Sequence, residues 1–351
     1  MAAPRRVGIL GAGWGTRVSV PAFRAAGWEV VGLWSRRPER AESEAARLAI
    51  PFFTGDASEL IARADIDAVA VHTPPGTHLD LCRAAFAAGK HVLCDKPFAG
   101  DATEARALHG EAERSGLVAM INYEFRFTPL RLQIAQLLGE GAIGQFQYAT
   151  FEVHTTNPMV QLERPWRLDP AQGGGLLNEL GSHAIDRTRQ WFGEITSVTA
   201  QLASFPPAGL APGLVTEDVL SARMEIGGGG FTTLTMSWVA DPPPGLQVTI
   251  VGSEGVLRAR SSGSMLSEGE VWLGRSGETE STLLPRPPDE ASFATANSAV
   301  AASERLIRAF AQGIEEGVSP APDFSDGLQS QIVIDAIRAS AAEGRTVELP
   351  A

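Results

Sequence analysis

Short apolar runs alternate with helical patterns through the first third of the chain. Five of these runs have the length and composition of buried strands: 7–11, 29–34, 68–72, 91–94 and 117–121. Helical spacing of apolar residues lies between them, most clearly at 38–48, 78–88 and 101–114. Strands that alternate with helices are typical of βαβ units and a parallel sheet. We therefore expect an α/β fold that begins with a doubly wound Rossmann domain over residues 1–122.

The pattern changes after Asn122. Strand-like runs now follow one another at 145–154, 197–202, 219–226, 231–238, 247–251 and 256–259. Helical patterns stand apart from these runs, at 129–138, 176–192, 303–316 and 327–343. Four glycines, 227–230, separate two of the runs, as expected for an antiparallel hairpin. We predict that residues 123–351 form an α+β domain with a large, mainly antiparallel open sheet.

Composition narrows the class of protein. The chain has 351 residues, of which 44% are hydrophobic and 20% charged, and this suits a folded protein of about two domains. Because 29 Lys and Arg face 41 Asp and Glu, a nucleic-acid partner, which needs a basic face, is not expected. No apolar run reaches the ~18 residues of a membrane span, and the apolar start is too short for a signal peptide. Two cysteines give no disulfide framework, so we expect a cytoplasmic protein with reduced thiols and no membrane partner.

A glycine-rich segment follows the first predicted strand and opens a helix. Gly11, Gly13 and Gly15 form a GxGxG pattern, with Trp14 inside it and Thr16 at the usual position of a third glycine. Such glycines allow a tight turn and a close approach of the backbone to a pyrophosphate. The helix start supplies N–H donors and the positive end of the helix dipole. The pattern favours dinucleotide binding, and the alternative is a glycine turn in an ordinary α/β protein.

The end of the second predicted strand bears on the choice of cofactor. An NAD site usually carries Asp or Glu here, which accepts from the ribose 2′-hydroxyl. This strand ends in Trp34, Ser35, Arg36 and Arg37. Ser35 and Arg36 favour a 2′-phosphate, because arginine offers a planar fork and a permanent charge. We predict NADP in preference to NAD; the alternative is that both arginines are solvated charges.

Two further loops follow predicted strands. One contains Thr73 and Pro74 and leads to His78, and the other contains Asp95 and Lys96. Both belong to the carboxyl edge of the sheet, where open α/β folds bind ligands. A lysine at this edge can polarise a substrate oxygen. Taken alone, a β–α turn and a surface lysine explain the same residues.

The second predicted domain contains one group of residues suited to acid–base chemistry. Three glycines, 173–175, lead into the predicted helix 176–192. Glu179, His183 and Asp186 follow at positions i, i+4 and i+7, and on an α-helix they form one stripe. A carboxylate one turn before a histidine can orient the imidazole ring. A metal site is not expected, because no third ligand has a clear spacing, and a structural histidine is the alternative.

Together these motifs resemble the Gfo/Idh/MocA family of oxidoreductases, named for glucose–fructose oxidoreductase, inositol dehydrogenase and rhizopine catabolism. The resemblance covers nearly the whole chain. It also rests on Asn122 with Arg126, on Trp166 with Arg167, and on the C-terminal stretch 325–350. It implies a Rossmann domain, a nicotinamide cofactor between the two domains, and a C-terminal domain whose open sheet often mediates oligomers. A homodimer or homotetramer is expected on this ground.

The resemblance also implies roles for individual residues. Lys96 matches the family's lysine that meets the substrate oxygen, and His183 matches its catalytic histidine. Glu179 stands where the family usually has Asp, so its carboxylate reaches one methylene further, and Asp95 replaces a commoner Glu. The residues expected to bind the cofactor are Gly11, Gly13, Trp14, Gly15, Thr16, Ser35, Arg36, Thr73, Pro74, His78, Asp95, Lys96, Asn122, Trp166 and Arg167.

The leading hypothesis is an NAD(P)-dependent oxidoreductase that transfers hydride between nicotinamide and a sugar, polyol or related cyclic hydroxyl or keto compound. The same fold also suits a reductase of a non-sugar carbonyl compound or a dihydrodiol. A third hypothesis is an NAD(P)-binding sensor without turnover. Loss of the lysine or the histidine is expected in such a sensor, and both Lys96 and His183 are present here.

Overall fold

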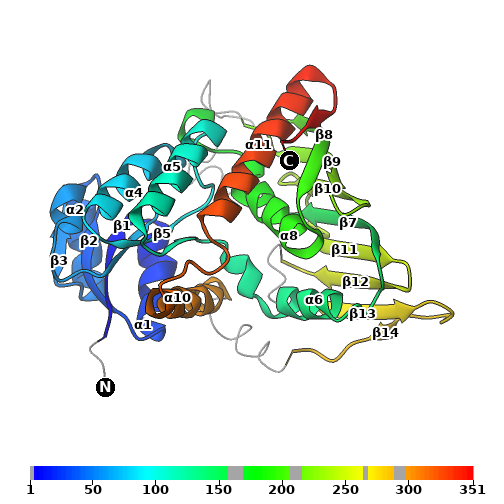
Figure 1. Ribbon diagram of the computed structural model, residues 1–351, viewed down its shortest axis with the longest axis horizontal. Coiled ribbons are helices and arrows are strands. Elements are labelled where there is room, and N and C mark those ends of the chain that lie inside the picture. The colour runs from blue at the N-terminus through cyan, green and yellow to red at the C-terminus, as the bar shows by residue number, and fades with distance from the viewer. Residues whose placement is uncertain (1–3, 157–168, 206–215, 264–267, 288–297, 351) are drawn as a thin grey trace. The chain divides into compact units, whose positions relative to one another are not determined.

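The computed structural model describes residues 4–156, 169–205, 216–263, 268–287 and 298–350. The chain divides into two compact units (Figure 1). The first comprises Met1–Glu124 and Ala299–Gln331, and the second comprises Phe125–Ser298 and Ile332–Ala351. Residues late in the chain therefore return to the first unit, which a single boundary after residue 122 does not anticipate. The last division falls within helix α11 (Phe324–Glu343).

Six parallel strands form the sheet of the first unit, in the order β3-β2-β1-β4-β5-β6. Their bounds are β1 Arg6–Leu10, β2 Glu29–Trp34, β3 Phe52–Thr54, β4 Ala68–Val71, β5 His91–Cys94 and β6 Ala119–Ile121. The strands are apolar runs because both faces of a parallel sheet are covered. The strand order reverses between β1 and β4, which is the switch point where Rossmann folds bind ligands. The predicted doubly wound fold is confirmed.

Helices connect these strands and complete the first unit. They are α1 Val20–Ala25, α2 Pro38–Leu48, α3 Ala57–Ile61, α4 His78–Ala87 and α5 Ala102–Ser115. Helix α10 (Ser298–Glu316) and the start of α11 return to this unit through aromatic contacts. Phe310 stacks on Trp28 with the ring centroids 5.9 Å apart, and Phe324 meets Phe98 edge-on at 4.7 Å. The burial of these rings explains why residues 299–331 belong here.

Nine strands form the sheet of the second unit, in the order β14-β13-β12-β11-β7-β10-β9-β8-β15. Their bounds are β7 Phe146–His154, β8 Ile195–Ala203, β9 Val219–Ile226, β10 Phe231–Ser237, β11 Gly245–Gly252, β12 Gly255–Ser261, β13 Glu270–Arg275, β14 Thr282–Leu283 and β15 Val347–Glu348. Strands β7 and β10 pair in parallel, and the other described pairs are antiparallel. The mainly antiparallel sheet is therefore confirmed. The apolar pattern does not predict β13, β14 or β15, and two of these are only two residues long.

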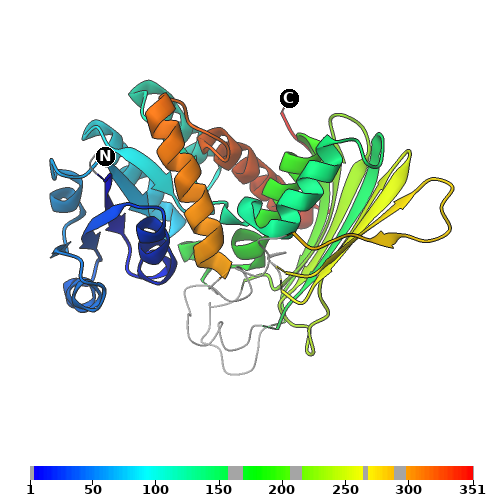
Figure 2. The same ribbon diagram turned by 90° about the horizontal axis from the view of Figure 1, so that it is seen from below.

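Helices cover one face of this second sheet. In Figure 2, α6 (Pro129–Gly139) and α8 (Ser182–Phe192) lie against one side of the strands. The C-terminal part of α11 joins the same core, to which Phe151, Leu234 and Ile334 contribute buried side chains. The other face carries the alternate residues, which are more polar. Among the helices of the described ranges, none is long and apolar enough to cross a membrane.

Candidate active site

The glycine loop lies at the carboxyl end of β1, beside the switch point. Gly11 has a φ of +122°, and a Cβ there would lie 2.1 Å from the carbonyl oxygen of His72, so only glycine fits. Beside Gly13 there is open space, because no atom lies within 4 Å of the position that a Cβ would take. The following helix starts with a π-helical turn, Gly15–Ser19, and no side chain caps it. Its first N–H groups can therefore bind a phosphate, and the loop fits a dinucleotide.

The other predicted residues of the loop stabilise it from within. Thr16 is buried, and its hydroxyl donates to the carbonyl oxygens of Ala12 at 3.1 Å and Gly13 at 3.4 Å. Trp14 is half-buried. Arg40, on α2, donates from its guanidinium to the Ala12 carbonyl oxygen at 2.8 Å. Arg40 was not expected from the sequence, although a cation shortly after Ser35 is a signal that could have found it.

The segment after β2 presents cations and no acid. Ser35 is buried at the strand end, and its hydroxyl oxygen accepts from the Arg37 N–H at 3.3 Å. Arg36 is exposed and makes no hydrogen bond or ion pair with the residues that the structure describes. Arg37 and Arg40 are exposed as well. The end of β2 is therefore followed by two exposed cations, with a third on α2.

The loop after β4 is closed by its own threonines and by His78. The Thr77 hydroxyl lies 2.7 Å from the Thr73 hydroxyl and donates to the Pro74 carbonyl oxygen at 2.8 Å. His78 is fully buried, with Nδ1 3.0 Å from the Phe98 carbonyl oxygen and Nε2 2.9 Å from that of Thr73. Burial lowers the pKa of His78, against the opposing effect of these hydrogen bonds. Both ring nitrogens are thus engaged with backbone, and His78 shapes the loop instead of facing a ligand.

Lys96 follows β5 and is half-buried. The carboxylate of Asp95 accepts from the Lys96 backbone N–H at 2.9 Å and from the Asn122 side-chain amide at 3.4 Å. His72 Nδ1 lies 3.1 Å from the other carboxylate oxygen. Burial raises the pKa of Asp95, but the hydrogen bond and charge of His72, with the charges of Lys96 and His78, bring that pKa below its ordinary value. An ionised carboxylate therefore lies under the Lys96 backbone, and Asn122 faces it.

The helix of the second unit that carries Glu179 and His183 departs from the predicted regular α-helix. A π-helical turn, Leu177–Gly181, precedes α8. Hydrogen bonds in a π-turn run to the fifth residue instead of the fourth. Glu179 lies in this wider turn, so its offset from His183 around the helix axis differs from the one that a regular α-helix gives. Glu179 is half-buried, whereas His183 and Asp186 are buried.

Two adjacent residues contact this helix from the start of the second unit. The Phe125 ring stacks on the His183 imidazole, with the centroids 3.9 Å apart and the planes 10° apart. Arg126 donates from Nε to both carboxylate oxygens of Asp186, at 3.1 and 3.0 Å, in a buried ion pair. Arg126 was expected from the sequence, whereas Phe125 was not, and its place beside Arg126 was the available signal. These contacts fix the plane of the His183 ring and the turn of helix that follows it.

The three-glycine turn is built around a carboxylate. Gly175 has a φ of +112°, and a Cβ there would lie 2.3 Å from Oε1 of Glu217. That oxygen accepts from the Leu177 N–H at 3.1 Å, and the Glu217 carbonyl oxygen accepts from the Leu176 N–H at 3.0 Å. Burial raises the pKa of Glu217, although the charge of Arg338 opposes the rise. Glu217 was not expected from the sequence; its position two residues before a predicted strand was the available signal.

The remaining candidates stand apart from these contacts. Trp166 and Arg167 lie outside the described residues. Within the described ranges, no cluster of His, Cys, Asp or Glu could hold a metal ion. Cys82 and Cys94 are free and buried thiols. Burial and the neighbouring Cys82 raise the pKa of Cys94 well above its usual value, so this thiol is not a ready nucleophile.

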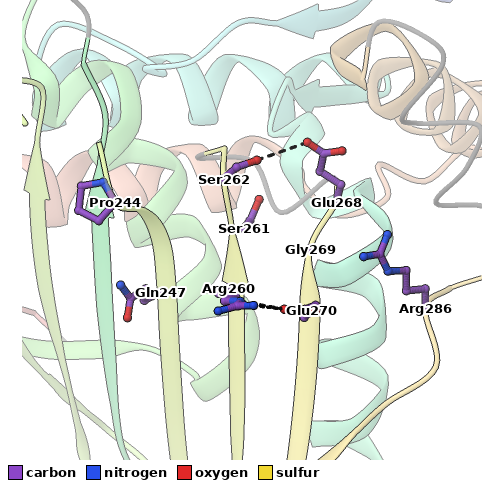
Figure 3. Close-up of a pocket in the computed structure, with 9 residues that line it drawn as sticks. All are labelled: Pro244, Gln247, Arg260, Ser261, Ser262, Glu268, Gly269, Glu270 and Arg286. Atoms are coloured by element: carbon purple, nitrogen blue, oxygen red, sulfur yellow. Dashed lines mark hydrogen bonds and ion pairs between the residues drawn. The ribbon is translucent and has the colours of Figure 1, made fainter. Parts of the chain in front are cut away.

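A cavity of about 610 Å³ lies at one end of the second sheet (Figure 3). Residues from the start of β11, the end of β12 and the start of β13 line it, together with Pro244 and Arg286. Arg260 pairs across it with Glu270 at 2.7 Å. None of the predicted site residues lines this cavity. The charges of Arg260 and Glu270 in this cavity pair with each other, and no residue that lines it is comparable to Lys96 or His183. The cavity is therefore not the site of the predicted chemistry.

The fold and these groups of residues define an oxidoreductase, and comparison with known families agrees. Residues 5–123 match the family model for the NAD-binding Rossmann fold of the Gfo/Idh/MocA oxidoreductases. Residues 135–349 match the C-terminal alpha/beta domain of the same family. The chain belongs to the Gfo/Idh/MocA oxidoreductase family, as its sequence motifs suggested.

Individual relatives span nearly the whole chain. D-xylose 1-dehydrogenase (NADP(+)) 2 of Haloferax volcanii is 28% identical over 352 residues, which cover 97% of this chain and 99% of the relative. Glucose-fructose oxidoreductase domain-containing protein 2 of Homo sapiens is 26% identical and covers 96% of this chain and 91% of its own. A levoglucosan dehydrogenase solved with NADH and levoglucosan has a similar fold, with a TM-score of 0.88 at 24% identity, covering 99% of this chain and 100% of its own.

Proposed function

We propose that this protein is an NAD(P)-dependent dehydrogenase that acts on the CH–OH group of a sugar, polyol or related cyclic hydroxyl compound. The observation that carries the proposal is the presence of two acid–base groups. One is Lys96, at the carboxyl edge of an NAD-binding sheet, and the other is His183, whose ring is held by Phe125. The relatives named for xylose and levoglucosan support the choice of a sugar-like substrate.

The side chains would divide the chemistry of alcohol oxidation between them. A nicotinamide cofactor held at the glycine loop would supply the hydride acceptor. His183 takes the hydroxyl proton as general base, so that the C–O bond becomes a carbonyl. Lys96 stabilises the negative charge that develops on the oxygen. Glu179 orients the His183 ring, and in the reductive direction His183 returns the proton.

Substitution of the two acid–base residues tests this mechanism. Loss of a general acid or base typically lowers turnover by about 10²–10⁴-fold. We expect that range for Lys96→Ala and for His183→Ala, with cofactor binding retained. The assay is hydride transfer to NAD and NADP over a panel of sugars and polyols. The matched control is His109→Ala, at a half-buried helix position 3.7 Å from the Glu113 carboxylate. Turnover near that of the unsubstituted protein in both variants would contradict the mechanism.

The same assay separates the two alternative functions. Faster reduction of non-sugar carbonyl compounds than oxidation of any sugar would favour a reductase on the same fold. Cofactor binding without turnover on any panel member would favour a sensor.

We propose that NADP is preferred to NAD. Ser35 and Arg36 would bind the 2′-phosphate, and the exposed Arg37 and Arg40 add positive charge beside it. The relative from Haloferax volcanii is named for NADP, whereas the levoglucosan dehydrogenase was solved with NADH.

Titration with NADPH and NADH, followed by fluorescence, decides the cofactor. We expect the protein to bind NADPH more tightly and Arg36→Ala to lose about 10-fold or more of that preference, since a charge-assisted contact contributes ~1.5–3 kcal/mol. Arg106→Ala, an exposed arginine on α5 that bonds its own helix, is the control. Equal or tighter binding of NADH would show that Arg36 is a solvated charge.

We also propose a cytoplasmic homodimer or homotetramer formed through the helix-free face of the second sheet. On this face Thr150 lies between Thr233 and Thr249 in register, and Tyr148 lies beside Phe231, so the surface is flat and partly apolar. The buried free thiols agree with a reducing compartment. Light scattering on the eluting protein measures the mass, and a monomer at micromolar concentration would contradict this proposal.

A further inference from the structure

His72 is a buried histidine that the proposed mechanism does not use. It follows β4 directly, and its side chain is shielded from solvent. Its carbonyl oxygen occupies the place that a Cβ on Gly11 would need, and its ring carbon Cδ2 would lie 3.4 Å from a Cβ on Gly15. His72 therefore packs directly beneath the first and third glycines of the dinucleotide loop.

Another edge of the His72 ring contacts the loop that contains Asp95 and Lys96. Nδ1 lies 3.1 Å from Oδ2 of Asp95, and Oδ1 of the same carboxylate accepts from the backbone N–H of Lys96 at 2.9 Å. Asn122 adds a third contact to this carboxylate, from its side-chain amide to Oδ1 at 3.4 Å. One carboxylate thus joins His72 to the backbone of Lys96, and all of these residues belong to the first unit.

We propose that His72 is a positioning residue, which holds the Asp95 carboxylate under the Lys96 backbone and so links the placement of Lys96 to the glycine loop. The inference rests on the proposed function, because it assigns Lys96 to the substrate. The contacts from His72, Lys96 and Asn122 all end on the carboxylate, so its protonation breaks the link. His72 keeps that carboxylate ionised, since an opposite charge or a donor favours the charged form.

The titratable groups that face this pair are His78 of α4, Cys94 at the end of β5 and Lys96 itself. Cys94 keeps its proton at neutral pH, because burial raises its pKa. Burial lowers the pKa of His78, so His78 changes charge in acid solution. Any pH effect must therefore be separated from His78, whose pKa the charge of His72 also lowers. His72→Asn and His72→Leu both remove that charge, so a difference between these two variants does not come from His78.

The decisive comparison is His72→Asn against His72→Leu. The asparagine amide nitrogen can take the place of Nδ1 and donate to Asp95, whereas leucine has a similar volume and no donor. We expect His72→Leu to lower kcat by about 10- to 100-fold, the equivalent of one hydrogen bond to a charged group. We also expect it to move the acidic limb of the kcat/KM profile to higher pH, because Asp95 protonates more easily. His72→Asn should restore both values, with His109→Gln as the control.

A second measurement does not depend on turnover. Nitrogen NMR of the six histidines, with His72 assigned through His72→Asn, follows the Nδ1 resonance of His72 in the unsubstituted protein and in Asp95→Leu. Loss of the carboxylate should move this resonance, because Nδ1 loses the partner that lies 3.1 Å away. An unchanged Nδ1 resonance in Asp95→Leu would overturn the proposal whatever the enzyme does with sugars. The proposal would also be overturned if the acidic limb of the kcat/KM profile were identical in His72→Leu and in the unsubstituted protein.

Discussion

Replacement of Gly175 by alanine tests the construction of the helix start that leads to His183. The new Cβ would lie 2.3 Å from Oε1 of Glu217 and 2.7 Å from Cδ, so the carboxylate must move. When it moves, the Leu177 N–H loses its acceptor at 3.1 Å. The φ of +112° is also strained for any residue with a Cβ. Gly175→Ala therefore combines backbone strain with the loss of a hydrogen bond to a charged group.

The backbone strain and the lost hydrogen bond each have a known range of free energy. Backbone strain of this kind costs about 1–3 kcal/mol, and loss of a hydrogen bond to a charged group costs about 1.5–3 kcal/mol. We expect Gly175→Ala to lower the free energy of unfolding by about 2.5–6 kcal/mol, the sum of these ranges. Gly193 is the matched control, because its φ is +97° and no atom lies within 4 Å of a Cβ there. Gly193→Ala should show the strain alone.

Urea denaturation followed by tryptophan fluorescence measures both variants, and Glu217→Ala supplies the second background. In that background the carboxylate is absent, so Gly175→Ala should cost only the backbone strain. The excess of Gly175→Ala over Gly193→Ala should therefore disappear. If Gly175→Ala costs the same in both backgrounds, the glycine is not there to make room for Glu217, and the explanation of this turn is wrong.

Two further predictions concern buried charges of the second unit. Burial raises the pKa of Glu217, so the folded state holds this proton more tightly than the unfolded state; the resulting stabilisation is present in acid and is lost as pH rises through the folded pKa. Glu217→Gln should therefore flatten the pH dependence of the unfolding free energy on the acidic side of neutrality, and an unchanged slope would contradict the assignment. Arg126→Met should destabilise the protein by about 3–5 kcal/mol, because it leaves Asp186 buried without its ion-pair partner. Addition of Asp186→Leu should recover most of that loss in urea denaturation, and no recovery would show that the arginine acts through packing alone.

The local signals in this sequence were strong enough to place most elements. Strand β2 and helix α2 coincide with the predicted residues 29–34 and 38–48. Helix α5 agrees within one residue at each end with the predicted pattern 101–114, and the carboxylate of Asp101 at its start accepts from the N–H groups of Thr103 and Glu104. Each of these features depends on residues close together in the chain. Apolar periodicity, capping and glycine turns are local properties, so they can be recognised in the sequence without the structure.

The Rossmann domain, the glycine loop and the candidate acid–base residues were thus determined by the sequence alone. The tertiary structure decided which residues hold them in place. His72 meets Asp95 across neighbouring parallel strands, and Glu217 reaches Gly175 from the segment that precedes β9 in the second unit. Both ring nitrogens of His78 lie within hydrogen-bond distance of backbone carbonyl oxygens. Tertiary packing also places residues 299–331 in the first unit. These outcomes arise between residues distant in sequence, where side-chain packing and hydrogen bonding select partners that local periodicity does not encode.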